Sequence, residues 1–234
     1  MDSRWSLSPN VFGPQTGHSQ LFVGDGNDNE RGSQMRRNFR VVPAVLTVFF
    51  SLFIYSPVWA SIISGHVECK GVKSNQWVVI YVDTISGKEF SPSAPAVMNQ
   101  KGKEFVPHVL PVLKGTTVEF LNEDPFMHNV FSPDDVADAV NLGSWPQGEK
   151  KLHTFNKLGN AVMLCNMHPE MEGWVVVLPT PYFAVTDEKG DYIIKDVPDG
   201  KYTLKTWHQK LGPSQSEAVV ASGGVTKIDF TLTK

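Results

Sequence analysis

Thr117-Val118-Glu119-Phe120 and Ile228-Asp229-Phe230-Thr231-Leu232 alternate apolar with polar residues. That alternation is typical of a strand with one buried and one exposed face. Trp77 to Val82 and Gly173 to Leu178 are apolar on both faces, as expected of central strands. Runs of this kind recur from Ser61 onward, separated by Gly, Pro, Asn and Asp. We therefore predict an all-β protein made of one β-sandwich or two.

Ser132-Pro133-Asp134-Asp135 is the one helix start that the sequence offers after the first 60 residues. It combines a capping residue, a proline for the first turn and acidic residues. Because Gly143 follows soon after, only one or two helical turns are expected.

The composition excludes several classes of protein. Of 234 residues, 41% are apolar and 19% charged, so the chain can bury a core and is not generally disordered. The net charge of -3 argues against a nucleic-acid partner. With only two cysteines, Cys69 and Cys165, the protein is no disulfide-stapled scaffold.

Residues 35–60 have the pattern of an export signal. Arg36, Arg37 and Arg40 precede an almost wholly apolar run from Val41 to Tyr55. Small residues end the segment, so residues 35–60 are predicted to be a signal peptide, cleaved after Ala60. The mature protein would then be periplasmic. The alternative is a membrane anchor over residues 41–63 with the remainder facing the periplasm.

Residues 1–34 have no periodicity and are rich in Gly, Asn, Asp, Ser and Gln. They are expected to be disordered. Because Met35 begins a signal of ordinary length, Met35 is the expected translation start and residues 1–34 would then lie outside the protein.

Two short stretches carry side chains that bind metals. His128 follows the predicted strand Thr117–Leu121, and Cys165-Asn166-Met167-His168-Pro169-Glu170-Met171 follows Ala161–Leu164. A thiolate, two imidazoles and a weak axial thioether form a blue-copper site. Since Cys165, His168 and Met171 recur at every third position, a tight loop can direct all three to one centre. His128 can complete the site from a neighbouring strand.

Other uses of these residues are less well supported. Structural zinc would usually require two or more cysteines in this segment, and haem attachment would require a second cysteine before His168. A multicopper oxidase needs more than the seven histidines present. A disulfide between Cys69 and Cys165 is the sharpest competing use of the cysteines. The remaining histidines are assigned to the surface or to packing: His66, His108, His153 and His208.

The stretch from about residue 95 to 178 resembles the cupredoxin family. The C-x-x-H-x-x-M spacing of Cys165, His168 and Met171 is similar to the ligand loop of amicyanin, and His128-Asn129 resembles the family's first ligand motif. The resemblance implies a Greek-key β-sandwich with one type 1 copper site. His128, Cys165 and His168 would be the strong ligands, Met171 the axial ligand, and Asn129 a brace for the cysteine loop.

The resemblance also implies electron transfer. In such proteins the second histidine reaches the surface through an apolar patch, for which Met127, Met167 and Pro169 are the candidates around His168. The partner would be a periplasmic redox protein, either a dehydrogenase or a cytochrome. Because no nucleophile, base and orienting group occur together, no enzyme activity is expected. The alternatives are copper binding or delivery without electron transfer, and a structural interaction module with a vestigial copper site.

The remaining residues are predicted to form a second, smaller sandwich. Asp-Gly turns between alternating strands in residues 179–234 resemble the carboxypeptidase regulatory-like, transthyretin-like family. Residues 61–93 match the opening strands of that family. The cupredoxin region, residues 94–178, would then be inserted into a discontinuous sandwich. The alternative is that residues 61–93 are extra cupredoxin strands and residues 179–234 are an independent module.

Overall fold

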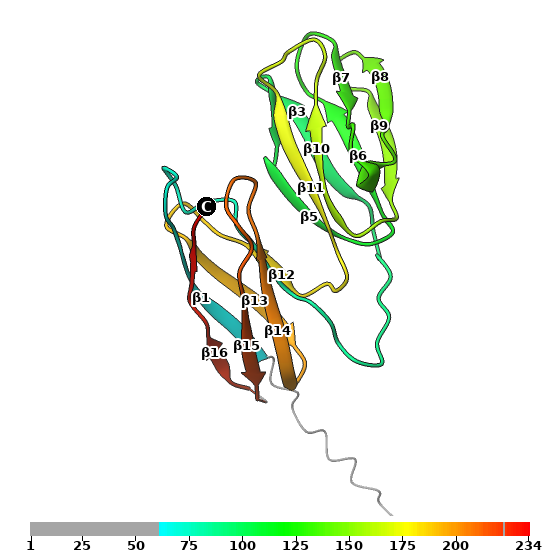
Figure 1. Cartoon of the computed structure of the whole chain (residues 1–234). Coiled ribbons are helices and arrows are strands. Elements are labelled where there is room, and N and C mark those ends of the chain that lie inside the picture. Colours follow the sequence, from blue (N-terminus) through cyan, green and yellow to red (C-terminus); the bar gives the residue numbers. More distant parts are fainter. Residues whose placement is uncertain (1–60, 222) are drawn as a thin grey trace, which may run out of the picture. The chain divides into compact units, whose positions relative to one another are not determined.

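The structure, a computed structural model, describes residues 61–221 and 223–234 (Figure 1). The predicted signal peptide at residues 35–60 and the segment 1–34 lie outside these ranges. The described chain is almost wholly β, which confirms the predicted fold class. None of its helical segments is long and apolar enough to cross a membrane.

The strands between residues 96 and 178 pair only with one another and form two sheets. One sheet has the order β5-β11-β10-β7-β8 and the other β4-β3-β6-β9. Figure 1 draws most of these strands in green and yellow. Their bounds are β3 Ala96–Lys101, β4 Glu104–Val106, β5 Val109–Leu113, β6 Thr116–Asn122, β7 His128–Phe131, β8 Asn141–Trp145, β9 Lys150–Phe155, β10 Gly159–Leu164 and β11 Glu172–Leu178.

The core between these two sheets is formed by the buried residues that alternate with exposed ones along the strands. In β6 every second residue from Thr116 to Asn122 is buried, as the sequence pattern predicted. The largest side chains in this core are fully buried aromatic ones, including Phe120 of β6, Trp145 of β8 and Phe155 of β9. Burying one such side chain stabilises the fold by about 1.5–3 kcal/mol. Cys165 belongs to the same core, so the sheet packing itself holds one predicted ligand.

The second sandwich combines strands from both ends of the described chain. One sheet has the order β13-β1-β16, with β17 also pairing with β1, and the other has the order β12-β2-β14-β15. The bounds are β1 Ser61–Cys69, β2 Val79–Val82, β12 Phe183–Val185, β13 Asp191–Val197, β14 Gly200–Trp207, β15 Gln215–Val220, β16 Val225–Lys227 and β17 Phe230–Leu232. Both sheets contribute to its core, through Ile63 and Val67 on one side and Ile80 and Leu204 on the other.

Strand pairing therefore joins segments that are far apart in sequence. β2 pairs with β12 and β14, and β1 pairs with β13, β16 and β17. Along the chain, the cyan strands of Figure 1 are followed by the green and yellow ones, and the orange and red strands then pair back with the cyan ones.

The structure changes two local predictions. The strand predicted over Ile228–Leu232 is interrupted, because Ile228 and Asp229 separate β16 from β17. Both residues bond to other strands there: the Tyr192 hydroxyl donates to the Ile228 carbonyl, and the His66 backbone N–H donates to Asp229. The predicted helix is a single 3₁₀ turn, Asp135–Ala137.

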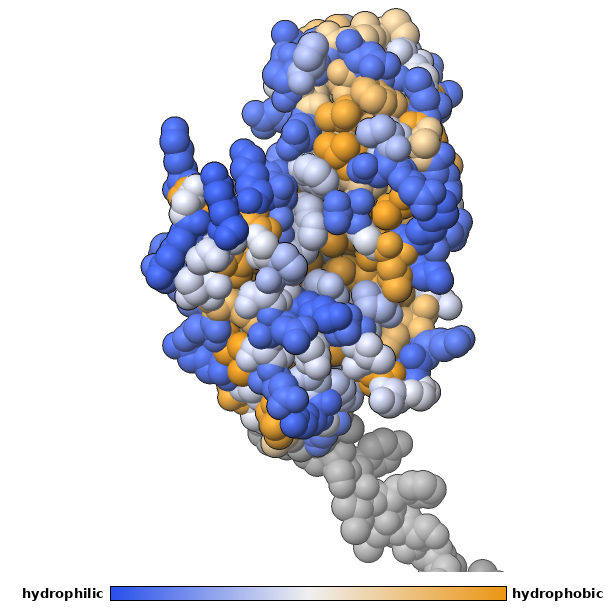
Figure 2. Space-filling view, viewed as in Figure 1, coloured by the Kyte–Doolittle hydropathy of each residue, from blue (hydrophilic) through white to orange (hydrophobic). Residues whose placement is uncertain are grey.

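Hydrophilic residues cover most of the face drawn in Figure 2, and apolar residues come to that surface in separate groups. Among the exposed large apolar side chains of the described chain are Phe126, Met127 and Met167, which lie in the two metal-binding stretches.

Candidate metal centre

Three potential ligand atoms converge in the larger sandwich. Cys165 Sγ lies 3.9 Å from His128 Nδ1 and 3.8 Å from His168 Nδ1, and the two nitrogens are 3.1 Å apart. The centre of this triangle is about 2 Å from each atom. That spacing is close to the length of metal–imidazole bonds and slightly below that of metal–thiolate bonds. The three side chains therefore fit one transition-metal ion.

Strand ends bring these atoms together. His128 is the first residue of β7, and Cys165 directly follows β10. The two strands pair antiparallel at their last residues, Leu164 and Phe131, so the chain after Leu164 runs back along β7 toward His128. A backbone hydrogen bond of 2.9 Å from Met171 N–H to the His168 carbonyl then closes the ligand loop.

Burial differs among the predicted ligands. His128, Cys165 and Met171 are buried, with no more than 3% of any of them exposed, while His168 is half-buried. Met171 belongs to the same core cluster as Cys165. A metal held here would be shielded from water except along the His168 ring.

Asn129 braces the cysteine loop. Its side-chain oxygen accepts a hydrogen bond of 3.3 Å from the Asn166 backbone N–H, next to Cys165. Its side-chain nitrogen donates to Asn141 Oδ1 and to the Gly143 carbonyl, both at 3.0 Å. Asn129 therefore ties the cysteine loop to β8.

Asp124 is a site residue that the sequence reasoning missed. Its Oδ2 lies 2.8 Å from His128 Nε2, and both side chains are buried. With Nε2 donating to this carboxylate, Nδ1 is left as the metal-binding nitrogen, and it is Nδ1 that faces Cys165 and His168. Asp124 stands only four residues before His128 in the sequence. That spacing alone did not show that the chain turns between them and brings the carboxylate to the ring.

The surroundings of Asp124 keep it ionised. Burial alone would raise its pKa, but hydrogen bonds from the backbone N–H groups of Lys103 and Gly102 and from His128 outweigh that effect. The net result is a pKa below the ordinary value. Asn122 shapes the turn by accepting a hydrogen bond from the Asp124 backbone N–H.

Exposed apolar residues accompany the half-buried His168 in the two metal-binding stretches. Met127 and Met167 are 44% and 49% exposed, and Pro169 is also exposed. Phe126, which the sequence reasoning did not include in the patch, lies with its ring centre 5.3 Å from that of His168. Phe126 therefore places an apolar ring beside the one predicted ligand that reaches solvent, and the other three residues add exposed apolar surface in the same two stretches.

The second cysteine takes no part in this site. Both cysteines are free, which removes the competing interpretation of a Cys69–Cys165 disulfide. Cys69 lies in the core of the smaller sandwich and Cys165 in the core of the larger one. Burial raises the pKa of the Cys69 thiol, which keeps it protonated and unreactive.

No protein-family model and no curated protein matches this chain. Among solved structures, a purple cupredoxin from Nitrosopumilus maritimus is 26% identical, with a TM-score of 0.32 over 35% of this chain and 98% of that chain. The oxidised form of an amicyanin variant is 26% identical, with a TM-score of 0.34 over 37% and 85% of the two chains. A copper-containing nitrite reductase from Thermus scotoductus SA-01 is 28% identical, with a TM-score of 0.35 over 49% and 28%. These similarities cover at most half of the chain, and the metal assignment rests on its own donor atoms.

Proposed function

We propose that this protein is an exported type 1 copper protein that passes single electrons between redox partners in the periplasm. The observation that carries the proposal is the convergence of one thiolate and two imidazole nitrogens within 4.8 Å of one another in a mostly buried site. A thiolate with two imidazoles and a nearby thioether is the ligand set of blue-copper electron carriers.

His128, Cys165 and His168 would hold the copper ion, with Met171 as the weak axial ligand. The bound ion would supply one-electron redox chemistry at this position. The chain's own contribution is a rigid and dry site: Asn129 fixes the cysteine loop, and Asp124 fixes the ring of His128. Ligands that barely move between oxidation states keep the reorganisation small, which suits a carrier better than an enzyme.

Partner docking would take place at the rim of Phe126, Met127, Met167 and Pro169 around His168. An exposed apolar patch at the solvent-facing ligand lets a partner approach the site without a strong, long-lived complex. The partner would be a periplasmic dehydrogenase or cytochrome. Delivery to that compartment would follow from the predicted signal peptide, cleaved after Ala60.

The decisive measurement is the visible spectrum of the copper-loaded, oxidised protein. We expect an intense thiolate-to-copper band and a reversible reduction potential. Cys165→Ser should abolish the band, while Cys69→Ser, which removes the chain's other thiol, should leave it unchanged. A colourless protein that retains only Cu(I) would contradict the carrier and favour copper delivery, and a protein that takes up no copper would favour a structural role.

A second substitution tests the axial position. Met171→Gln replaces a thioether with an amide oxygen, so it should shift the reduction potential and the spectrum while copper binding is largely kept. If voltammetry and absorption of this variant both matched the unmodified protein, Met171 would not be the axial ligand.

A further inference from the structure

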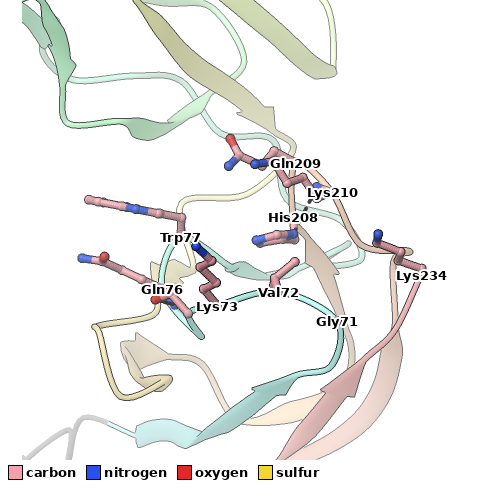
Figure 3. Close-up of a pocket in the computed structure, with 10 residues that line it drawn as sticks. Gly71, Val72, Lys73, Gln76, Trp77, His208, Gln209, Lys210 and Lys234 are labelled. Carbon is pink, nitrogen blue, oxygen red and sulfur yellow. Dashed lines mark hydrogen bonds between the residues drawn. The ribbon is translucent and has the colours of Figure 1, made fainter. Parts of the chain in front are cut away.

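The smaller sandwich contains a pocket that the copper site does not use (Figure 3). It has a volume of about 700 Å³ and lies between the loop after β1 and the end of β14. The residues that line it are Gly71, Val72, Lys73, Ser74, Gln76, Trp77, His208, Gln209, Lys210 and Lys234.

The pocket is rich in positive charge and hydrogen-bond donors. Lys73 and Lys210 form no ion pair with any residue of the described chain. No aspartate or glutamate side chain is among the described residues that line it. Gln76 adds an amide group, whereas the Gln209 side-chain oxygen is already hydrogen-bonded. A cavity with two unpaired ammonium groups and no acidic side chain among its lining residues favours an anionic occupant.

His208 supplies a fixed donor in this pocket. Its side chain is buried, with 8% of the residue exposed, and its Nδ1 accepts hydrogen bonds from the backbone N–H groups of Lys210 and Leu211 at 3.1 and 3.2 Å. Because Nδ1 is an acceptor, the ring proton is on Nε2. Nε2 has no hydrogen-bond partner among the described residues, and the ring extends toward the same space as Lys73 (Figure 3).

The charge of His208 is consistent with this tautomer. Burial, with a smaller contribution from Lys210, lowers the pKa of His208, so the ring is neutral at neutral pH. A neutral ring that accepts at Nδ1 must carry its hydrogen on Nε2. The direction of the Nε2–H bond is therefore fixed by the backbone N–H groups of the loop after β14, whether or not a ligand is bound.

We propose that this pocket binds a small oxyanion, the carboxylate or phosphate group of a soluble metabolite or of a larger anionic molecule. Lys73 and Lys210 would neutralise the charge, His208 Nε2–H would donate the central hydrogen bond, and the amide of Gln76 would donate to an outer oxygen. The site would make this protein responsive to an anion independently of its copper chemistry.

The test is a titration of the ¹⁵N-labelled protein with inorganic phosphate and, separately, with succinate, at constant ionic strength. We expect saturable shifts of the Lys73, Trp77 and Leu211 amide signals with at least one of the two anions. The anion that binds more tightly identifies the oxyanion class. If neither anion produced saturable shifts, the proposal would be wrong.

Three variants distinguish a specific anion site from nonspecific attraction of the anion to surface lysines. Lys73→Gln and Lys210→Gln should each raise the dissociation constant about 3- to 10-fold, as expected for the loss of one charged contact. His208→Asn keeps a side-chain oxygen near the position of Nδ1 but removes the Nε2 donor, and it should weaken binding by a similar factor. If His208→Asn fails to fold, the two lysine variants still decide the matter.

Lys195→Gln is the matched control. It makes the same charge change on β13, near the opposite end of β1 from this pocket. We expect an unchanged dissociation constant. Equal weakening by Lys195→Gln and Lys73→Gln would mean that only net charge attracts the anion, which would overturn the proposal.

Discussion

At the level of single residues, the hydrogen bond between Asp124 and His128 Nε2 determines which nitrogen of that ring is available to a metal. The carboxylate also accepts hydrogen bonds from two backbone N–H groups, at Gly102 and Lys103, so it cannot move without leaving buried donors unpaired. Asp124 therefore positions a ligand through a rigid connection to the β3–β4 turn.

Asp124→Asn removes the negative charge and one acceptor from this arrangement. We expect a higher reduction potential, because the oxidised ion loses a nearby anion, and copper retention about 10- to 100-fold weaker. Voltammetry and competition with a chelator measure the two effects. Glu170→Gln neutralises an exposed carboxylate in the ligand loop without touching His128, and its potential should change less. Equal shifts in both variants would show that Asp124 acts through charge alone.

His208 gives the stability of the protein a pH dependence. Because its pKa is lowered in the folded protein, the unfolded chain takes up the proton first as the pH falls below about 6.5. Folding stability should therefore be fully present above that pH and decline below it. Urea unfolding between pH 7.5 and 5 checks this, and His208→Asn should flatten the slope. His153, whose pKa is also lowered by burial, accounts for part of the remaining slope.

The ligands were predictable from sequence, but their supports were not. Cys165, His168 and Met171 lie in one loop whose spacing is visible in the sequence, and His128 starts a strand next to it. Asp124 acts through the backbone of residues 102–103, and that contact depends on how β3, β4 and β6 pair. The anion pocket brings together side chains from positions 73 to 234, which no local pattern connects.

At the level of elements, the interruption between β16 and β17 depends on close backbone approach at Gly65. A Cβ at this position of β1 would clash with the Ile228 carbonyl and contact the Tyr192 ring. Even the methyl group of alanine does not fit at position 65 without a shift of the neighbouring backbone. The alternating pattern of residues 228–232 predicted the faces correctly, but it could not show a break imposed by a neighbouring strand.

Gly65→Ala should destabilise the protein by about 2–4 kcal/mol, because backbone on both sides would have to move. Thermal or urea unfolding measures the change. Gly212→Ala is the control, since its added methyl group would make only an ordinary 3.5 Å contact with the Thr233 carbonyl. A loss below about 0.5 kcal/mol at Gly65 would mean that β1 and β16 separate easily.

At the level of the whole molecule, the two cores are built from different residues, and only one contains predicted ligands. Copper should therefore stabilise the strands of the larger sandwich selectively. A ligand at a thousand times its dissociation constant adds about 4 kcal/mol to the state that binds it.

Hydrogen exchange measured by mass spectrometry with and without copper checks this expectation. Exchange should slow in β6, β7, β10 and β11 and change little in β1 and β13, and Cys165→Ser should remove the difference. Equal slowing throughout residues 61–221 would mean that the two sandwiches unfold as one unit.

The pairing of β1 with the last two strands also sets an order of events during synthesis. All four proposed copper ligands precede residue 172, whereas β1 gains β16 only after residue 227 and β17 only after residue 232 has been made. The edge of β1 that pairs with β16 and β17 therefore stays unpaired while the residues between β1 and β16 are synthesised. All four proposed ligands are therefore present in the nascent chain before the smaller sandwich is complete.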